Sequence, residues 1–199
     1  MTPGSAGPTV VDANPVASDT VPALNTAIPI IWLFFWLYWL LAAITAKESV
    51  GSQRMRPTGL PVFLVAVVVL HLFKWGMAVT APAVQVVGMV LLLAGLVLAV
   101  WARVYLGRNW GMPMTQRAEP ELVTSGPYRY VRHPIYSGIL LAMLGTALAT
   151  DLSWLIVALM LGAYFVYSAT VEERNLLITF PSQYPPYRTR TKMVVPFVL

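Results

Sequence analysis

The chain has 199 residues, of which 58% are hydrophobic and 11% are charged, and its mean hydropathy is +0.70. These values exclude an ordinary soluble domain and are typical of an integral membrane protein. The net charge of +5 does not indicate a nucleic-acid partner, because the basic residues lie between apolar runs rather than along one soluble face. The absence of cysteine excludes disulfides, thiolate catalysis and cysteine-bound metals.

Residues 1–26 contain no lysine or arginine and are rich in glycine, alanine, proline, serine and threonine. Because a secretory signal peptide begins with a basic region, this segment does not resemble one. Its composition predicts a disordered N-terminal tail.

Five apolar runs follow, and their lengths predict an all-α integral membrane protein with five transmembrane helices. The runs cover residues 27–46, 60–80, 83–106, 135–149 and 153–170. The fourth run is short for a span, so we expect its helix to begin at Pro134. Gly88 with Gly95, and Gly138 with Ala142, have the spacing of small residues that let helices pack closely. The sequence thus predicts three helices in residues 27–106. Residues 107–199 form a cofactor-binding and catalytic part with two more helices and a C-terminal segment.

The basic residues lie on one side of this five-helix arrangement. Twelve of the thirteen lie in the first connection, in or after the third helix, or after the fifth, with Lys74 as the exception. The N-terminal tail and the connections at residues 81–82 and 150–152 contain none. The positive-inside rule therefore places the N-terminus outside and the C-terminus in the cytoplasm. We expect a protein of a bacterial-type inner membrane whose active site faces the cytoplasm.

Residues 126–136 read Gly-Pro-Tyr-Arg-Tyr-Val-Arg-His-Pro-Ile-Tyr and carry the densest group of polar side chains. Such a group is costly inside a bilayer, so it is predicted to lie at the membrane surface. His133 precedes a helix N-terminus, where main-chain N–H groups favour an anion and where Arg129 or Arg132 would add positive charge. For the arginines alone, binding to the phosphates of membrane lipids is the favoured interpretation.

Glu172 and Glu173 lie at the predicted cytoplasmic end of the fifth helix. Carboxylates at that position oppose the helix dipole, which suggests that they hold a cation. A metal is poorly supported because only one histidine lies nearby, so an ammonium or sulfonium ligand fits better. The sequence has no GxGxxG after a strand, and no GxxxxGK[ST], HExxH or GxSxG motif.

Residues 126–136 resemble the cofactor motif of the integral membrane isoprenylcysteine carboxyl methyltransferases, with phospholipid N-methyltransferases as more distant relatives. The resemblance covers residues 106–197 and includes Leu-Gly-Arg-Asn-Trp at 106–110 and Leu-Val at 122–123. It continues through a C-terminal pattern of Glu172, Glu173, Leu176, Leu177, Phe180, Tyr184, Tyr187 and Pro196.

The resemblance implies that the chain binds S-adenosylmethionine at the cytoplasmic surface and methylates a lipophilic acceptor that enters from the bilayer. It implies a cofactor pocket formed by seven side chains: Tyr128, His133, Tyr136, Glu172, Glu173, Tyr184 and Tyr187. His133 would lie near the methionyl carboxylate, and one of the two glutamates would hold the methionyl ammonium. The last two tyrosines would close the pocket, and no metal is required.

One position departs from the pattern of the isoprenylcysteine enzymes. In those enzymes an arginine four residues before the glutamate pair is implicated in holding the acceptor carboxylate, whereas this chain has Ser168. Arg108 is the candidate catalytic residue that would replace that arginine from the other side. The sequence does not choose between oxygen, nitrogen and sulfur acceptors, so an isoprenylated carboxylate and a lipid amine both stay open.

Two other functions compete with methyl transfer. Membrane reductases of the sterol-reductase type carry a similar Arg-His-Pro-x-Tyr segment for NADPH, but with Gly-x-Trp before it and Asn-Tyr after His-Pro. This chain instead has Tyr128 and Ile135, which favours the methyltransferase. A non-catalytic scaffold that binds lipid headgroups would explain the arginines but not His133 with the glutamate pair.

Overall fold

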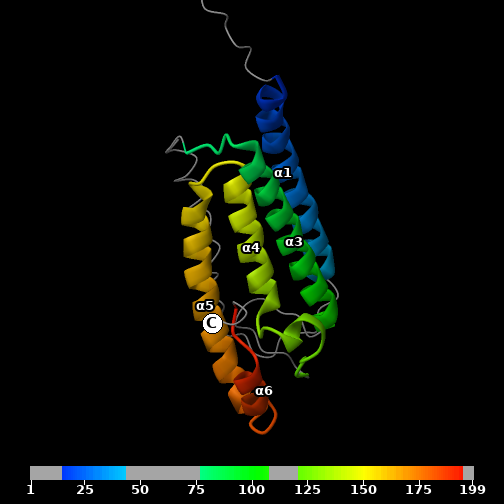
Figure 1. Ribbon diagram of the computed structural model, residues 1–199. Helices are drawn as coiled ribbons and strands as arrows, with labels where there is room; N and C mark the ends of the chain where they lie inside the picture. Colours follow the sequence, from blue (N-terminus) through cyan, green and yellow to red (C-terminus); the bar gives the residue numbers. More distant parts are fainter. Residues whose placement is uncertain (1–14, 44–76, 108–120, 195–199) are drawn as a thin grey trace, which may run out of the picture.

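The computed structural model describes residues 15–43, 77–107 and 121–194, which form a bundle of α-helices (Figure 1). The helices are α1 (Pro15–Ala43), α3 (Pro82–Leu106), the 3-10 helix η2 (Gly126–Arg129), α4 (Pro134–Ala149), α5 (Trp154–Thr179) and α6 (Tyr184–Arg190). Within these ranges there are two isolated β-bridges and no strand, in agreement with the predicted all-α class. Most of the predicted second span, residues 60–76, lies outside the described residues, as do residues 1–14 of the predicted tail.

The predicted starts and ends of the helices agree with the structure for α3 and for the start of α4 at Pro134. By contrast, α1 begins at Pro15 rather than at residue 27. The length of an apolar run predicts the part of a helix that crosses the membrane, and the helix itself can begin earlier. Its segment long enough to cross a membrane begins at Leu24. Likewise α5 continues to Thr179 rather than ending at residue 170, since the first helix-breaking residue is Pro181.

Helix α4 lies at the centre of the bundle, between α3 and α5 (Figure 1). A Cβ atom added at Gly95 would overlap Ala142, and one added at Gly138 would overlap Ala99. The main chains of α3 and α4 are therefore in direct contact. The small residues predicted at contact spacing therefore lie where the two helices meet. This contact fixes α4, whose N-terminal end carries the polar motif.

Three described helices are long and apolar enough to cross a membrane, namely α1 from Leu24, α3 and α5. Large apolar side chains such as Phe34, Val97 and Leu159 remain exposed on them, as expected for helices that face lipid. Helix α4 has 16 residues. Its length of about 24 Å is less than the hydrocarbon thickness of about 30 Å. It is nevertheless mostly buried, because its neighbours cover it.

Among the described residues, the two connections without basic residues lie at one end of the bundle, and the motif with Arg129 and Arg132 lies at the other end, together with α6 (Figure 1). At one end, the N–H of Val79 donates to the carbonyl of Thr150 at 2.9 Å, and that of Leu152 donates to Met77 at 3.1 Å. Residues 77–80, predicted as the end of the second span, are therefore extended and not helical. Ala81 is extended as well, since a residue before proline avoids the helical conformation. The motif and α6 lie at the other end; the membrane side that this end faces stays a prediction.

Arg103 and two glycines organise the end of the bundle that carries the motif. Arg103 is 3% exposed and donates through Nη1 to the carbonyl of Gly107 at 2.7 Å and through Nη2 to that of Ala42, which joins the ends of α3 and α1. Gly107 ends α3 with a φ of +53°. Gly126 has a φ of +58°, and a Cβ atom there would overlap the ring of Tyr105. Glycine thus lets η2 pack directly on α3.

Candidate functional site

The seven predicted pocket residues lie at the same end of the bundle on three separate segments. The segment from η2 to the first turn of α4 carries Tyr128, His133 and Tyr136, while α5 carries the two glutamates and α6 carries two tyrosines. All are buried except Glu172, whose side chain is 25% exposed. The predicted catalytic residue Arg108 lies outside the described residues.

A stack of three rings joins the motif to α5. The rings of His133 and Tyr136 are parallel to within 4°, with centroids 5.4 Å apart, and Tyr136 stacks on Phe165 at 4.3 Å. The Tyr136 hydroxyl donates to Glu172 Oε1 at 2.5 Å. Tyr136 thereby positions both the His133 imidazole, by ring stacking, and the Glu172 carboxylate, by a hydrogen bond.

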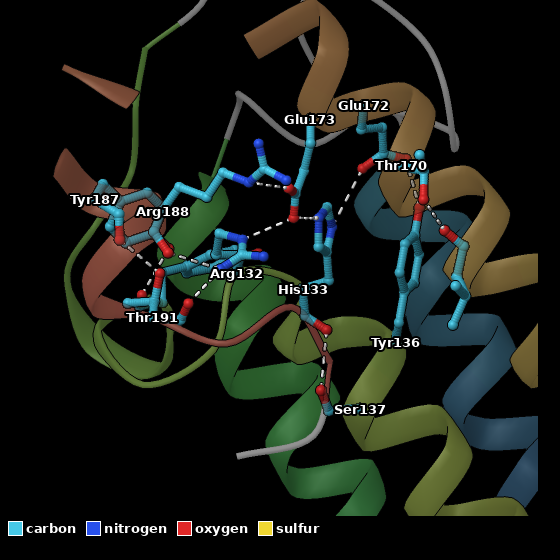
Figure 2. Close-up of polar contacts among 12 residues, drawn as sticks. Arg132, His133, Tyr136, Ser137, Thr170, Glu172, Glu173, Tyr187, Arg188 and Thr191 are labelled. Atoms are coloured by element: carbon cyan, nitrogen blue, oxygen red, sulfur yellow. Dashed lines mark hydrogen bonds and ion pairs between the residues drawn. The ribbon is translucent and has the colours of Figure 1, made fainter. Parts of the chain in front are cut away.

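His133 lies between the two carboxylates of α5, as Figure 2 shows. Its Nδ1 is 3.5 Å from Glu172 Oε2, and its Nε2 is 3.5 Å from Glu173 Oε1. Burial by itself lowers the pKa of His133, but its interactions with the two glutamates raise that pKa by more, and the net direction is upward. The structure therefore favours an imidazolium that is held by both carboxylates.

Glu173 is the buried anion of an ion cluster that we call the Glu173 cluster, formed with Arg132, His133 and Arg188 (Figure 2). Its Oε1 accepts from Arg132 Nε at 2.7 Å, and its Oε2 lies 3.2 Å from Arg188 Nε. Its side chain is only 4% exposed. Arg132, which the sequence suggested as a partner for a bound anion, is bonded here to a carboxylate of the chain itself.

The two glutamates, which the sequence treats alike, have different environments because adjacent residues of a helix point about 100° apart. Glu173 faces the arginines, while Glu172 faces Tyr136 and remains partly exposed. The expectation that both lie at the C-terminal end of the fifth helix is wrong, because α5 continues to Thr179. The argument from the helix dipole therefore does not apply to them.

The C-terminal strap, residues 191–194, lies along the motif in a parallel arrangement. The N–H of Arg132 donates to the carbonyl of Lys192 at 2.8 Å, and that of His133 donates to Met193 at 2.9 Å. The Ser137 hydroxyl donates to the carbonyl of Val194, and Arg132 Nη1 donates to that of Thr191. These bonds hold the end of the described chain against the start of α4.

Helix α6 adds two buried tyrosines to this end of the bundle. The Tyr187 hydroxyl donates to the carbonyl of Tyr128 at 2.7 Å, and burial raises the pKa of Tyr187 to about 12. Tyr184 is 0% exposed, and its hydroxyl has no hydrogen-bond partner among the described residues. Pro185 and Pro186 are tolerated because they occupy the first turn, where N–H groups have no partner within the helix.

Sequence reasoning placed the C-terminal segment in the cofactor-binding part but missed the roles of Arg188 and Phe165 and the pairing of the strap with the motif. Phe165 could have been found, because it lies seven residues before Glu172 and so on the same face of α5. The strap could not, because it pairs through main-chain groups that carry no sequence signal. In the part of the chain that the structure describes, no group of three or more His, Cys, Asp or Glu residues is arranged to hold a metal.

The family model "Phospholipid methyltransferase" matches residues 83–182, about half of the chain, and covers α3 after its first residue, the motif, α4 and α5. The chain belongs to this family. The match covers both the motif and the two glutamates, so it identifies this end of the bundle as part of a membrane methyltransferase fold. The resemblance to the isoprenylcysteine carboxyl methyltransferases inferred from the motif is confirmed by individual relatives.

Two relatives and one solved structure are informative. Protein-S-isoprenylcysteine O-methyltransferase B of Arabidopsis thaliana is 33% identical over 115 residues, which cover 56% of this chain and 58% of that protein. Methanethiol S-methyltransferase 2 of Bradyrhizobium diazoefficiens is 41% identical over 69 residues, covering 35% of this chain and 26% of that protein.

The solved structure is that of the eukaryotic intramembrane Ras methyltransferase, isoprenylcysteine carboxyl methyltransferase. It superposes with a TM-score of 0.68 at 23% identity and covers 94% of this chain and 70% of that one. This similarity establishes the fold of an integral membrane protein. The chain spans less than two thirds of the length of the curated relatives described above.

Proposed function

We propose that this family member is an S-adenosylmethionine-dependent methyltransferase that acts on a lipophilic acceptor at the cytoplasmic surface of the membrane. The observation that carries this proposal is the family match over residues 83–182, which includes both the motif and the glutamate pair. These residues also meet in one cluster, with His133 within 3.5 Å of both carboxylates.

The polar side chains around His133 fit the polar groups of the cofactor. Glu172 is the glutamate for the methionyl ammonium, because its carboxylate is partly exposed while that of Glu173 is buried against two arginines. The Tyr184 hydroxyl is buried without a hydrogen-bond partner among the described residues, which gives a ligand a further polar contact. Glu173 then holds α6 in place and does not contact the cofactor.

S-adenosylmethionine supplies a methyl group on a positively charged sulfur, which a nucleophile displaces in line. A carboxylate acceptor would need no proton transfer, so orientation and the exclusion of water would provide most of the acceleration, whereas a thiol or amine acceptor would also have to release its proton. The ring stack of His133, Tyr136 and Phe165 fixes the orientation of Glu172. Buried Tyr128 and Tyr187 exclude water from the α6 side.

The relatives support methyl transfer but not one acceptor. One acts on a prenylated cysteine and another on methanethiol, so carboxylate oxygen and sulfur are both represented. For an amine acceptor, the support from these comparisons is the word phospholipid in the family description. The competing reductase interpretation is supported only by the Arg132-His133-Pro134 segment. The family match argues against this interpretation.

The proposal is tested by a thermal-shift titration of the purified protein in detergent with S-adenosylhomocysteine and, separately, with NADPH. A ligand at a hundred times its Kd stabilises a protein by about 2.7 kcal/mol, which is readily measured. We expect a shift with S-adenosylhomocysteine alone, and a weaker one for Glu172→Gln. Arg190→Ala is the control, because this exposed side chain bonds only within α6, to Pro186, among the interactions described. A shift with NADPH alone would make the protein a reductase.

A further inference from the structure

His133 already places a positive charge beside the carboxylate that we assign to the cofactor. Its Nδ1 lies 3.5 Å from Glu172 Oε2, and its Nε2 lies 3.5 Å from Glu173 Oε1 (Figure 2). The structure favours the imidazolium form of this side chain. An ammonium group that binds to Glu172 therefore competes with a cation of the chain itself.

The two carboxylates beside His133 differ in how readily they can exchange a partner. Glu173 is 4% exposed and is bonded to Arg132 and Arg188, so its contact with Nε2 is fixed. Glu172 is 25% exposed, which leaves it accessible to a ligand. Its Oε1 accepts from the Tyr136 hydroxyl, and it has a further interaction besides these. The contact between Nδ1 and Glu172 is thus the one that a ligand can replace.

The charge on His133 depends on that replaceable contact. In the described part of the chain, the ionisable side chains around His133 and its two carboxylates come from the motif, α4, α5 and α6: Arg132, Tyr136, Glu172, Glu173, Tyr184 and Arg188. Lys192 of the adjacent strap is exposed. Burial opposes the charge on His133, and the interactions with Glu172 and then Glu173 outweigh burial and raise the pKa of His133. A ligand cation at Glu172 removes the larger of these two contributions and adds repulsion, so the imidazole should lose its proton.

A neutral imidazole would itself become part of the ammonium site. It has one N–H donor and one nitrogen with a lone pair. Because Nε2 faces the fixed carboxylate of Glu173, the remaining proton belongs on Nε2. The lone pair is then on Nδ1, which faces Glu172 and can accept a hydrogen bond from an ammonium group.

We propose that the methionyl ammonium binds to both Glu172 Oε2 and His133 Nδ1, and that the proton of Nδ1 is released to water in the exchange. This inference rests on the proposed methyltransferase function, since it concerns the binding of that cofactor. It differs from the expectation that His133 lies near the methionyl carboxylate. The N–H bond at Nδ1 breaks, its proton goes to the solvent, and an N–H of the ligand takes its place. Affinity for the cofactor therefore falls as the pH falls.

The size of the effect follows from the raised pKa of His133. At pH 6.5 the imidazole of the free protein is at least about half protonated, so binding should release about 0.5–1 proton per ligand. The affinity for a ligand that carries the ammonium should be about three- to tenfold higher at pH 7.0 than at pH 6.0.

The experiment is calorimetry with three probes that share adenosine and a thioether. S-adenosylhomocysteine has the ammonium and the carboxylate, its decarboxylated analogue has only the ammonium, and 5′-methylthioadenosine has neither. Each is titrated into the purified full-length protein at pH 6.0, 6.5 and 7.0. At pH 6.5, two buffers with different enthalpies of ionisation give the number of protons released. The same titrations are made with His133→Gln, whose amide does not titrate, and with Arg190→Ala, an exposed control that bonds within α6.

We expect the two probes with an ammonium to release a proton and to bind more tightly at pH 7.0, in the parent and in Arg190→Ala. Methylthioadenosine should show neither effect, and His133→Gln should abolish both effects for all probes. The comparison of the three probes in the parent decides the question even if His133→Gln does not fold.

The exchange at His133 would be overturned, with the methyltransferase function left in place, by any of three results. These are binding of S-adenosylhomocysteine without proton release, proton release that persists in His133→Gln, and a pH dependence that the decarboxylated analogue does not share. If the parent bound none of the three probes, the proposed function itself would be overturned, and the exchange with it.

Discussion

The Glu173 cluster predicts that Glu173→Gln destabilises the protein much more than Glu172→Gln does. Glu173 and Arg132 have side chains that are only 4% and 9% exposed, and their atoms lie 2.7 Å apart. Removing one charge from such a pair leaves the other buried without compensation, which costs about 3–5 kcal/mol. The Arg188 side chain is 49% exposed, so its bond to Glu173 contributes at most about 1 kcal/mol.

Denaturant or thermal unfolding of the detergent-solubilised variants measures these differences, and trypsin cleavage after Arg190 and Lys192, which all the variants keep, reports on release of α6 and the strap. We expect an order of destabilisation of Glu173→Gln, then Arg188→Gln, then Glu172→Gln. Replacing both Arg132 and Glu173 by methionine should destabilise the protein less than either single replacement does, because no buried charge is then left without a partner. The reasoning would be refuted if Glu173→Gln lost less than about 0.5 kcal/mol of unfolding free energy. It would also be refuted if Arg188→Gln lost as much unfolding free energy as Glu173→Gln.

Three further predictions concern packing, pH and hydrogen bonding. Gly145→Ala should destabilise the protein by about 1–3 kcal/mol in unfolding experiments, because the added Cβ atom overlaps the main chain of α3. The control Gly162→Ala should be neutral or stabilising, since the nearest atom to its Cβ is a side-chain carbon at 3.7 Å; equal losses in both would contradict this account. The folded-state pKa of His133 is raised, so its stabilising contribution is complete below pH 6.5 and is lost as the pH rises through that raised value. His133→Gln should therefore flatten the fall in melting temperature above pH 6.5, and an unchanged profile would contradict the pairing with the two carboxylates. Tyr187→Phe should cost about 1 kcal/mol, because it removes a buried hydrogen bond of 2.7 Å, whereas Tyr184→Phe should cost nothing in the free protein. Equal losses in both tyrosine variants would argue against these assignments.

The sequence predicted the α-helical membrane class, the position of α3 and the start of α4 at Pro134. These features depend on local properties, namely the length of an apolar run and the preference of proline for the first helical turn. Charge alone separated the connections into two groups, and in the described residues these groups lie at opposite ends of the bundle. The motif at residues 126–136 and the two glutamates also led from the sequence to the methyltransferase family, which the family match confirms.

The different roles of Glu172 and Glu173 were decided only by the tertiary structure. The two residues are adjacent and chemically identical, so no property of the sequence distinguishes the carboxylate that binds Arg132 from the one that stays partly exposed. Sequence patterns thus determined which residues gather at one end of the membrane helices. The partners of each charge depend on contacts between α5, α6 and the strap, which form only when segments distant in the sequence pack together.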